Sequence, residues 1–295
     1  KYKDFYFSGL CFNSLVCKKD NIFFAIKGNE VDGNKFINSA IKNGAKTIVS
    51  NQKYQGIRNN ILYINSLNVR KSLAEISFNI NKTKPKNLIA VTGTNGKSSI
   101  ADFYFQILKL KKKKVASIGT LGIKTISYKQ KVLNTTLDPI KLSSCLDKLK
   151  KKKIDNVILE ASSHGLKQHR LDGLKFKIGI FTNLSHDHLD YHKNFKDYLK
   201  SKLYLFENLL KKNSNIITDI EIPEYKEIKK ISLRKKLNIE TISNYKSNLK
   251  IIFHKYINKK QLVKIKYKNI YYNFETNLIG KIQIKNLLMA MLAAE

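Results

Sequence analysis

Residues 87–108 constrain the fold most strongly, because their apolar spacing changes from that of a strand to that of a helix across a glycine-rich turn. The apolar run at 88–91 predicts a short strand buried on both faces. Apolar residues from Ile100 to Leu108 recur at helical spacing and predict an amphipathic helix. Between them, residues 93–98 read Gly-Thr-Asn-Gly-Lys-Ser. A strand, a glycine turn and a helix in this order indicate a phosphate-binding loop.

This loop contains the residue types that phosphate binding requires. Gly93 and Gly96 let backbone N–H groups wrap phosphate oxygens. Lys97 reaches the terminal phosphates and Ser98 offers a hydroxyl to Mg²⁺. The spacing departs from the standard loop, because Val91 stands where its first glycine should be. An ordinary strand-to-helix turn is the alternative, and the agreement between residues and context argues against it.

The high positive charge of the chain suggests an anionic partner, but the distribution of the lysines does not support one. The net charge of +34 comes from 56 Lys and Arg against 22 Asp and Glu, which normally suggests nucleic acid or an anionic membrane surface. The lysines are spread along the chain, and clusters such as 111–114 and 150–153 fall at expected helix ends. We therefore interpret most of them as solvated surface and expect no nucleic-acid partner.

Cysteine usage and hydropathy indicate the compartment. Cys11, Cys17 and Cys145 are odd in number and lack the spacing of a metal site, which predicts buried or incidental thiols in a reducing cytosol. No apolar run reaches 18 residues and no signal peptide is visible, so we expect a cytoplasmic protein without membrane insertion. The chain starts at Lys1 and stops inside an apolar helical pattern, so we expect it to be part of a longer protein.

The order of predicted elements indicates an α/β fold with two domains. Residues 1–84 predict a small α/β domain, and the polar stretch 81–86 with its proline is the best candidate linker. In residues 85–295, strands alternate with helices, which predicts a central domain with a mostly parallel sheet. Apolar and alternating segments within 250–274 predict a β meander at the side of this domain.

Ligands bind beyond the carboxyl ends of parallel strands, so we expect the phosphate loop, Glu160 and the segment 182–190 at one edge of the sheet. Glu160 ends a predicted strand, where a Mg²⁺ bound to ATP would need a hard oxygen ligand. His186, His188 and His192 could suggest zinc, but no Cys or second His cluster completes a tetrahedral set. A phosphate or Mg²⁺ role for His188 is the better interpretation.

A lysine on the apolar face of a predicted helix is the remaining oddity. In the helix predicted at 195–210, Lys202 falls on one stripe with Phe195, Leu199 and Phe206. A snorkelling lysine would explain this pattern equally well. The functional interpretation is a lysine that points inward, near the metal edge.

These motifs resemble those of the Mur ligases of peptidoglycan assembly, and the resemblance covers essentially the whole chain. It is carried by 92–98 (Thr-Gly-Thr-Asn-Gly-Lys-Ser), 134–136 (Asn-Thr-Thr), 160–170 (Glu-Ala-Ser-Ser-His-Gly-Leu-Lys-Gln-His-Arg) and 182–192 (Thr-Asn-Leu-Ser-His-Asp-His-Leu-Asp-Tyr-His), with Tyr198 and Lys202 in step. The motif at 160–170 is specific for the member that extends UDP-N-acetylmuramoyl-L-alanyl-D-glutamate. The loop at 92–98 is shared with sister ligases and folylpolyglutamate synthases.

The resemblance implies an ATP- and Mg²⁺-dependent acid–amino-acid ligase. The D-glutamyl carboxylate would attack the γ-phosphate of ATP, and the amine of meso-diaminopimelate or L-lysine would displace phosphate from the acyl phosphate. The implied catalytic residues are Lys97, His188 and Lys202. The implied metal ligands are Ser98, Glu160, His188 and Lys202 as its carbamate.

The resemblance also implies nucleotide and substrate contacts. The implied ATP contacts are Gly93, Thr94, Asn95, Gly96, Lys97, Ser98, Ser99 and Asn286, the last near the adenine. The implied contacts to the UDP-linked dipeptide are Ser14, Asn134, Thr135, Thr136, Ser162, Gln168 and Arg170, of which Arg170 suits a carboxylate. The first domain would bind the uridine nucleotide, and we expect a monomer.

The sequence departs from the family pattern at some positions. The family's Asp-Ser-Arg appears as Asn13-Ser14-Leu15, Asn29 replaces a usual His, and Gln283 replaces the first Asn of the last motif. The family's third domain, which selects the amino acid and closes over ATP, is missing from these residues. We therefore expect this segment alone to bind nucleotide weakly and not to ligate.

Alternative functions make different predictions. A sister Mur ligase or a folylpolyglutamate synthase would share the phosphate loop, and 162–170 argues against both. A basic nucleic-acid-binding P-loop ATPase would show hydrolysis stimulated by DNA. A degenerate, non-catalytic scaffold is supported only by the losses at Leu15 and Asn29.

Overall fold

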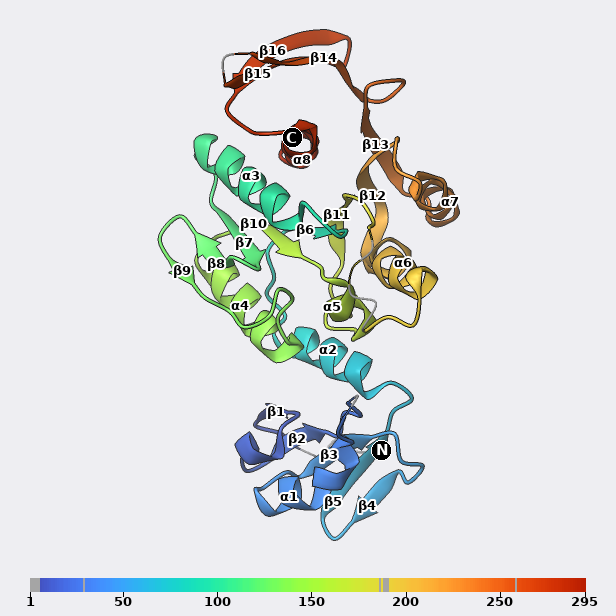
Figure 1. The fold of residues 1–295 in the computed structure, drawn as a ribbon. Coiled ribbons are helices and arrows are strands. Elements are labelled where there is room, and N and C mark those ends of the chain that lie inside the picture. The colour runs from blue at the N-terminus through green and yellow to red at the C-terminus, as the bar shows by residue number, and fades with distance from the viewer. Residues whose placement is uncertain (1–5, 29, 186, 188–190, 258) are drawn as a thin grey trace. The chain divides into compact units, whose positions relative to one another are not determined.

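The computed structural model describes residues 6–28, 30–185, 187, 191–257 and 259–295. The chain forms two compact units (Figure 1). The first contains the chain up to Lys82 with Pro139–Ser143 and Gln168–Gly173, and the second contains Thr83–Asp138, Ser144–Lys167 and Leu174–Glu295. We keep the domain boundary predicted near residue 84 as a proposal, because two later segments also group with the first unit.

The first unit is a small α/β structure with a largely parallel sheet. Its strand order is β1-β2-β3-β5-β4, and β4 is antiparallel to β5. The strands are β1 (Gly9–Cys11), β2 (Asn21–Phe24), β3 (Thr47–Ser50), β4 (Gly56–Arg58) and β5 (Ile61–Asn65). The helices and 3₁₀ turns are η1 (Ser14–Val16), η2 (Gly33–Phe36), α1 (Ile37–Lys42) and α2 (Val69–Ile80).

Successive residues of β2 face opposite sides of this sheet, as a strand requires. Phe23 packs with Ile48 in one buried cluster. Phe24 packs with Val49 and Leu73 in another. Because both faces pack against apolar clusters, residues 22–24 of this strand are all hydrophobic, whereas Asn21 at its start is polar.

The second unit is organised by one large sheet with the strand order β16-β15-β14-β13-β12-β11-β6-β10-β7-β8-β9. Its central strands, from β14 to β7 in this order, pair in parallel. The strands are β6 (Asn87–Thr92), β7 (Val115–Gly119), β8 (Gly122–Thr125), β9 (Lys129–Gln130), β10 (Asn156–Glu160), β11 (Phe176–Phe181), β12 (Leu210–Asp219), β13 (Asn238–Ser243), β14 (Leu249–Ile257), β15 (Lys260–Tyr267) and β16 (Ile270–Thr276). The predicted α/β class with a mostly parallel central sheet is confirmed.

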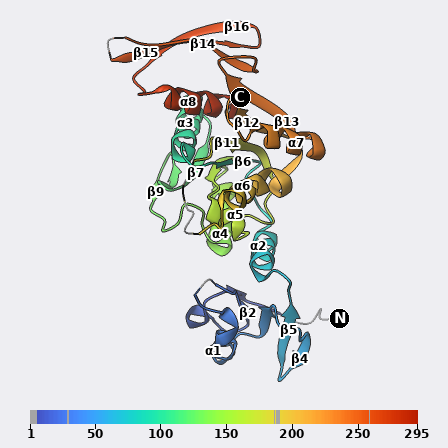
Figure 2. The ribbon, with the colours of Figure 1, turned by 45° about the vertical axis from the view of Figure 1, so that its right-hand side comes forward.

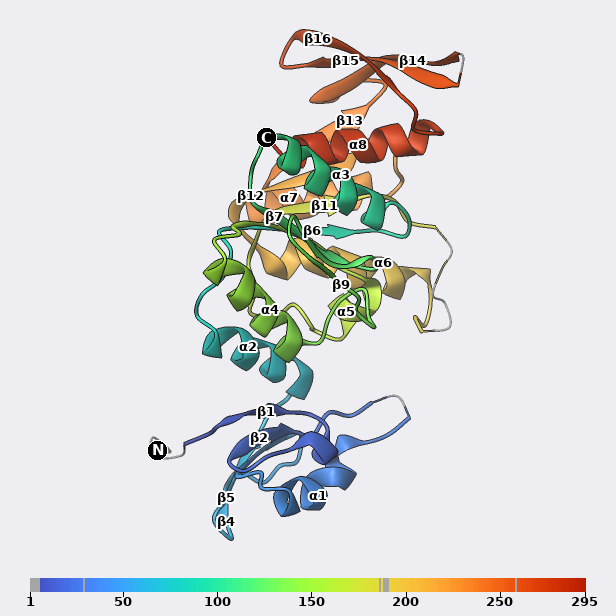
Figure 3. The same ribbon diagram turned by 90° about the vertical axis from the view of Figure 1, so that its left-hand side faces the viewer.

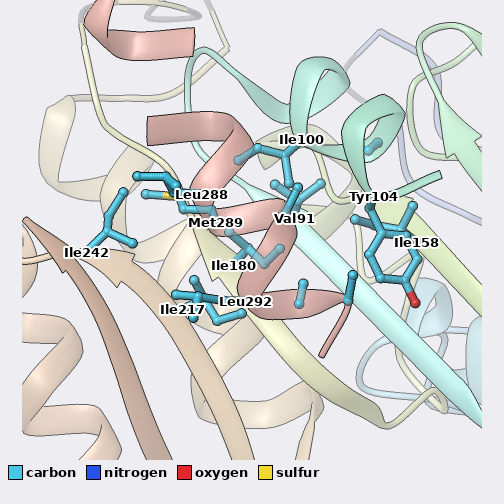
Figure 4. Close-up of a cluster of buried hydrophobic side chains, with 14 of the residues drawn as sticks. Val91, Ile100, Tyr104, Ile158, Ile180, Ile217, Ile242, Leu288, Met289 and Leu292 are labelled. Atoms are coloured by element: carbon cyan, nitrogen blue, oxygen red, sulfur yellow. The ribbon is translucent and has the colours of Figure 1, made fainter. Parts of the chain in front are cut away.

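Helices cover this sheet on both faces, with α3 and α8 on one side and α5 and α6 on the other (Figure 3). The helical segments are α3 (Lys97–Leu110), α4 (Pro139–Lys151), α5 (Ser163–Lys167), α6 (Phe195–Tyr204), η3 (Leu205–Leu209), α7 (Tyr225–Lys235) and α8 (Lys281–Ala293). Val91 of β6, Ile100 of α3 and Leu288 of α8 point into one buried cluster (Figure 4). Burying each such side chain contributes roughly 1.5–3 kcal/mol. The cluster therefore holds both helices against the strand that leads into the phosphate loop.

The predicted β meander is confirmed as β14–β16. Because β14 pairs in parallel with β13, the meander continues the sheet on the side of α8 (Figure 2). The structure corrects one detail of the sequence-based expectation. The helix predicted at 195–210 ends at Tyr204 and continues as a π-helical turn, and the chain enters β12 at Leu210. The wider turn buries Leu205, Phe206 and Leu209 together, which explains why regular α-helical spacing is lost there.

Candidate functional site

The phosphate loop lies at the carboxyl edge of the central sheet. β6 is flanked by β10 and β11, with Glu160 paired to Val91 and Phe181 paired to Thr92. The chain therefore leaves all three strands at neighbouring positions. The predicted convergence of the loop, Glu160 and Thr182 is confirmed for these residues.

The backbone of the loop adopts conformations that favour glycine. Gly93 has φ 139° and Gly96 has φ 89°. A Cβ atom on Gly93 would collide with the side chain of Thr182, and one on Gly96 would lie 2.6 Å from Asn286 Oδ1. Both glycines are therefore needed for close approach of neighbouring segments as well as for backbone geometry.

Residues after β11 hold the loop in place. Thr182 Oγ1 donates to Asn95 O at 2.6 Å, and Asn95 N donates to Asn183 Oδ1 at 3.0 Å. Thr94 N donates to Asn183 O at 2.9 Å. Sequence reasoning did not give Thr182 or Asn183 this holding role. Their place directly after a strand beside the loop was the signal available in the sequence.

Lys97 begins helix α3 and lies over the loop. Its Nζ donates to Gly93 O at 3.0 Å and to Thr94 O at 2.7 Å. Desolvation by burial lowers the pKa of Lys97, although nearby Glu160 and Asp187 raise it. The first turn of α3 leaves backbone N–H groups without helical partners, so this end of the helix suits phosphate oxygens.

Glu160 and Ser98 form a pair of hard oxygen groups at the loop. Glu160 is only 2% exposed, and Ser98 Oγ donates to its Oε2 at 2.9 Å. Thr120 donates to the same carboxylate from its backbone N at 2.9 Å and its Oγ1 at 3.1 Å. The sequence did not single out Thr120, because it reaches Glu160 through the pairing of β7 with β10. A carboxylate beside a hydroxyl at the foot of a phosphate loop is the donor set that Mg²⁺ prefers.

Lys202 is buried beside the loop rather than reaching toward solvent. It is 1% exposed, and its Nζ donates to Gly93 O at 2.7 Å. The pKa of Lys202 is lowered to about 7, chiefly because burial desolvates the amine and also because of nearby Lys97, while Asp187 acts in the opposite direction. The inward orientation settles what the helical pattern left open, since a snorkelling lysine would have an exposed amine.

Tyr198 connects the helix of Lys202 to the loop. Lys202 Nζ lies 4.3 Å from the centroid of the Tyr198 ring. The Tyr198 hydroxyl lies 3.1 Å from Thr94 Oγ1. Residues one turn apart on α6 thus contact two successive residues of the loop.

The histidine segment is only partly described. His186, His188 and Asp190 lie outside the described residues, so the role of His188 stays a prediction. His192 is buried, with its ring centroid 5.0 Å from that of Tyr198, and desolvation lowers its pKa. Within the described part of the chain, no group of three His, Cys, Asp or Glu side chains could hold a metal ion.

Part of the predicted substrate set gathers beside Glu160. Thr136 Oγ1 donates to Glu160 O at 2.9 Å and lies 3.0 Å from Ser162 Oγ. Thr135 Oγ1 lies 3.1 Å from Thr120 Oγ1. Asn134 precedes them at an exposed position. These hydroxyl groups therefore lie next to the candidate metal ligands.

The other predicted substrate residues belong to the first unit. Arg170 donates to Gln168 Oε1 from Nε at 3.0 Å and from Nη2 at 2.8 Å. Ser14 is buried in η1, and its carbonyl oxygen accepts a hydrogen bond from Asn43 Nδ2 at 2.8 Å. Ser14 therefore has a fixed backbone position.

Helix α8 brings Asn286 against the loop. Asn286 is 3% exposed and faces Gly96. The preceding residue, Lys285, donates to Asp219 Oδ2 and, at 2.7 Å, to Glu221 Oε2. Burial would raise the pKa of Glu221, but hydrogen bonds from Lys285 and its neighbours hold it at about 2. Sequence reasoning missed this ion-pair network, which ties the start of α8 to the end of β12.

Comparisons with known proteins give consistent similarities. The model of the Mur ligase middle domain matches residues 91–294, and the model of the Mur ligase family catalytic domain matches residues 7–84. A UDP-N-acetylmuramoyl-L-alanyl-D-glutamate--2,6-diaminopimelate ligase of Rickettsia montanensis is 38% identical, over 97% of this chain and 60% of its own length. The ligase of that name from Wigglesworthia glossinidia brevipalpis is 36% identical, over 95% of this chain and 59% of its own length.

Solved structures show the same similarity. A UDP-N-acetylmuramoyl-L-alanyl-D-glutamate--2,6-diaminopimelate ligase superposes with a TM-score of 0.85 at 27% identity, covering 98% of this chain and 59% of that one. A MurF ligase of Thermotoga maritima in complex with ADP superposes with a TM-score of 0.64 at 17% identity, covering 98% of this chain and 63% of that one. At this identity the similarity supports the fold alone. The chain spans about 60% of the length of the curated relatives it matches. Among the described helices, none is long and apolar enough to cross a membrane.

Proposed function

The chain belongs to the Mur ligase family, and from this premise we propose that it binds ATP and UDP-N-acetylmuramoyl-L-alanyl-D-glutamate in a ligase that adds a diamino acid. The added residue would be meso-diaminopimelate or L-lysine. The observation that carries the proposal is the convergence of the phosphate loop, the Ser98–Glu160 pair and buried Lys202 at one edge of the sheet. We further propose that the protein is a cytoplasmic monomer.

Nucleotide binding follows from the loop and from α3. The β- and γ-phosphates of ATP would lie along the loop, with Lys97 and the N-terminus of α3 binding their oxygens. Asn286 lies against Gly96, where it would approach the adenine. Ser98, Glu160 and His188 are the proposed Mg²⁺ ligands together with modified Lys202. A bound Mg²⁺ would neutralise phosphate charge and orient the γ-phosphate.

The environment of Lys202 suits conversion of its amine to a carbamate. Its neutral amine would attack CO₂, forming an N–C bond and releasing one proton. Burial favours the neutral amine, because it lowers the pKa of Lys202 to about 7. In addition, Lys97 and Lys202 both donate to the carbonyl oxygen of Gly93, so two positive charges would lie close together beside it. Carbamylation replaces one of these positive charges with a negative charge and removes that repulsion.

The reaction joins a carboxylate to an amine in two balanced steps. First, the D-glutamyl carboxylate attacks the γ-phosphorus of ATP, which gives an acyl phosphate and releases ADP. The amine of the diamino acid then attacks the acyl carbon and releases phosphate. Thr135, Thr136 and Ser162 offer hydroxyl groups beside Glu160, and Arg170 offers a guanidinium suited to a carboxylate.

Isotope transfer tests the proposed acyl phosphate. The D-glutamyl carboxylate of the UDP-linked substrate would be labelled with ¹⁸O and supplied with ATP, Mg²⁺ and the diamino acid to the full-length gene product. We expect one labelled oxygen in each phosphate released, because the carboxylate oxygen stays on phosphorus when the amine displaces it. Unlabelled phosphate accompanying ligation would contradict this mechanism.

A further inference from the structure

The first unit contains a pair of thiols that the proposed reaction does not use. Cys11 ends β1, and Cys17 directly follows turn η1. Their Sγ atoms lie 2.9 Å apart. Cys11 is 3% exposed and Cys17 is 8% exposed. Two residues six positions apart therefore meet in a buried place.

The backbone of η1 creates this contact. Val16 N donates to Asn13 O at 3.3 Å, and Cys17 N donates to Ser14 O at 3.2 Å. The Asn13 side chain caps the turn by accepting from Leu15 N at 3.0 Å. These hydrogen bonds close the turn and direct the chain back toward the end of β1. The turn therefore places the Cys17 thiol beside that of Cys11.

Two contacting thiols suit oxidation better than metal binding. Structural zinc needs four ligands, and within the described residues no group of three possible ligands is present. A disulfide needs an S–S distance of about 2.05 Å. Starting from the 2.9 Å separation, the sulfurs would move by less than about 1 Å, so no rearrangement of the turn is required.

We infer that Cys11 and Cys17 are a redox-active pair that closes to an intrachain disulfide by exchange with a small-molecule disulfide such as oxidised glutathione. Cys17, the more exposed of the two, first attacks the reagent as a thiolate, forms a mixed disulfide and releases one small thiol. The thiolate of Cys11 then attacks the Cys17 sulfur and releases the second small thiol. Two protein thiols lose two electrons, and one reagent disulfide gains them.

Burial affects the rate of this exchange. Desolvation by burial raises the pKa of Cys11, so its thiolate is scarce at neutral pH. The second step is therefore slow compared with the reaction of an exposed thiol. The closed ring would enclose Ser14 and restrain η1, which bears on uridine-nucleotide binding if the proposed function is right.

The experiment uses this chain, with Cys145→Ser as a background that leaves only the pair. The protein is equilibrated with oxidised glutathione, quenched with acid, denatured and measured by intact mass and by reaction with a thiol reagent. We expect the loss of two hydrogen atoms, no reactive thiol and no attached glutathione. Dithiothreitol should restore both thiols. A protein that keeps both thiols free, or carries glutathione on either cysteine, would overturn the inference.

Thermal melting supplies a second readout. A disulfide restrains the unfolded chain, so the oxidised protein should melt several degrees above the reduced protein. In Cys17→Ser, the same treatment should leave the melting temperature unchanged. Cys145 in the wild type is the matched control, because it is partly buried and should remain a free thiol. These measurements need no ligase substrate, so their failure is separable from failure of the proposed function.

Discussion

Replacing Lys202 by alanine in the full-length gene product is expected to reduce ligation by on the order of 10²–10³-fold or more, the cost of losing one well-placed electrostatic group in an active site. Lys202 is buried beside Gly93, so the substitution leaves a space within the phosphate site. Phosphate release that depends on the UDP-linked substrate is the measurement. Circular dichroism should show that the variant is folded.

Chemical rescue separates a missing carboxylate from a structural defect. Formate or acetate should partly restore turnover in Lys202→Ala, because a small carboxylate fits the vacated space. The same anions should not rescue Lys202→Met, whose side chain fills that space. Lys200→Ala is the matched control, since Lys200 is exposed on the same helix. Unchanged turnover in Lys202→Ala would remove this residue from the mechanism.

Replacing Lys97 by methionine is expected to have an effect of similar size, on the order of 10²–10³-fold in turnover. Methionine keeps much of the length of the side chain but removes the charge that would bind the terminal phosphates. The Lys97 amine donates to Gly93 O and Thr94 O, so its loss also removes two hydrogen bonds to the loop, although Gly93 O still accepts from Lys202. Binding of a fluorescent ATP analogue and phosphate release would measure affinity and turnover separately.

Lys109→Met is the control for Lys97→Met. Lys109 is exposed near the other end of α3, and its substitution should change neither quantity. A Lys97→Met protein with wild-type turnover would mean that the loop does not bind the transferred phosphate in the way proposed. Because Lys97 and Lys202 share Gly93 O, their double variant should lose less than the two single losses combined.

Local patterns predicted the strands and helices around the phosphate loop. The apolar run before Gly93 became β6, and the helical spacing after Ser98 became α3. The rule that ligands bind at the carboxyl edge of parallel strands then placed Glu160 and Thr182 beside the loop, as the strand register confirms. These features were predictable because each depends on residues close together in the sequence or on a general property of α/β sheets.

Contacts between distant segments were not predictable from one sequence. Thr120 reaches Glu160 because β7 and β10 are neighbours, and no local pattern indicates that pairing. The meeting of Cys11 and Cys17 depends on the closure of η1, a turn that their spacing alone does not specify. The inward position of Lys202 needed the packing of α6, since helical spacing fits an inward and a snorkelling lysine equally.

The most direct test of the central claim is phosphate release by the full-length gene product. The assay supplies Mg²⁺ and ATP with UDP-N-acetylmuramoyl-L-alanyl-D-glutamate, and adds meso-diaminopimelate or L-lysine one at a time. We predict release that requires the UDP-linked dipeptide together with one of the two amino acids. Release that does not require the dipeptide but is stimulated by DNA or a folate would contradict the assignment to this ligase. It would still agree with the interpretation of residues 93–98 as a phosphate-binding loop.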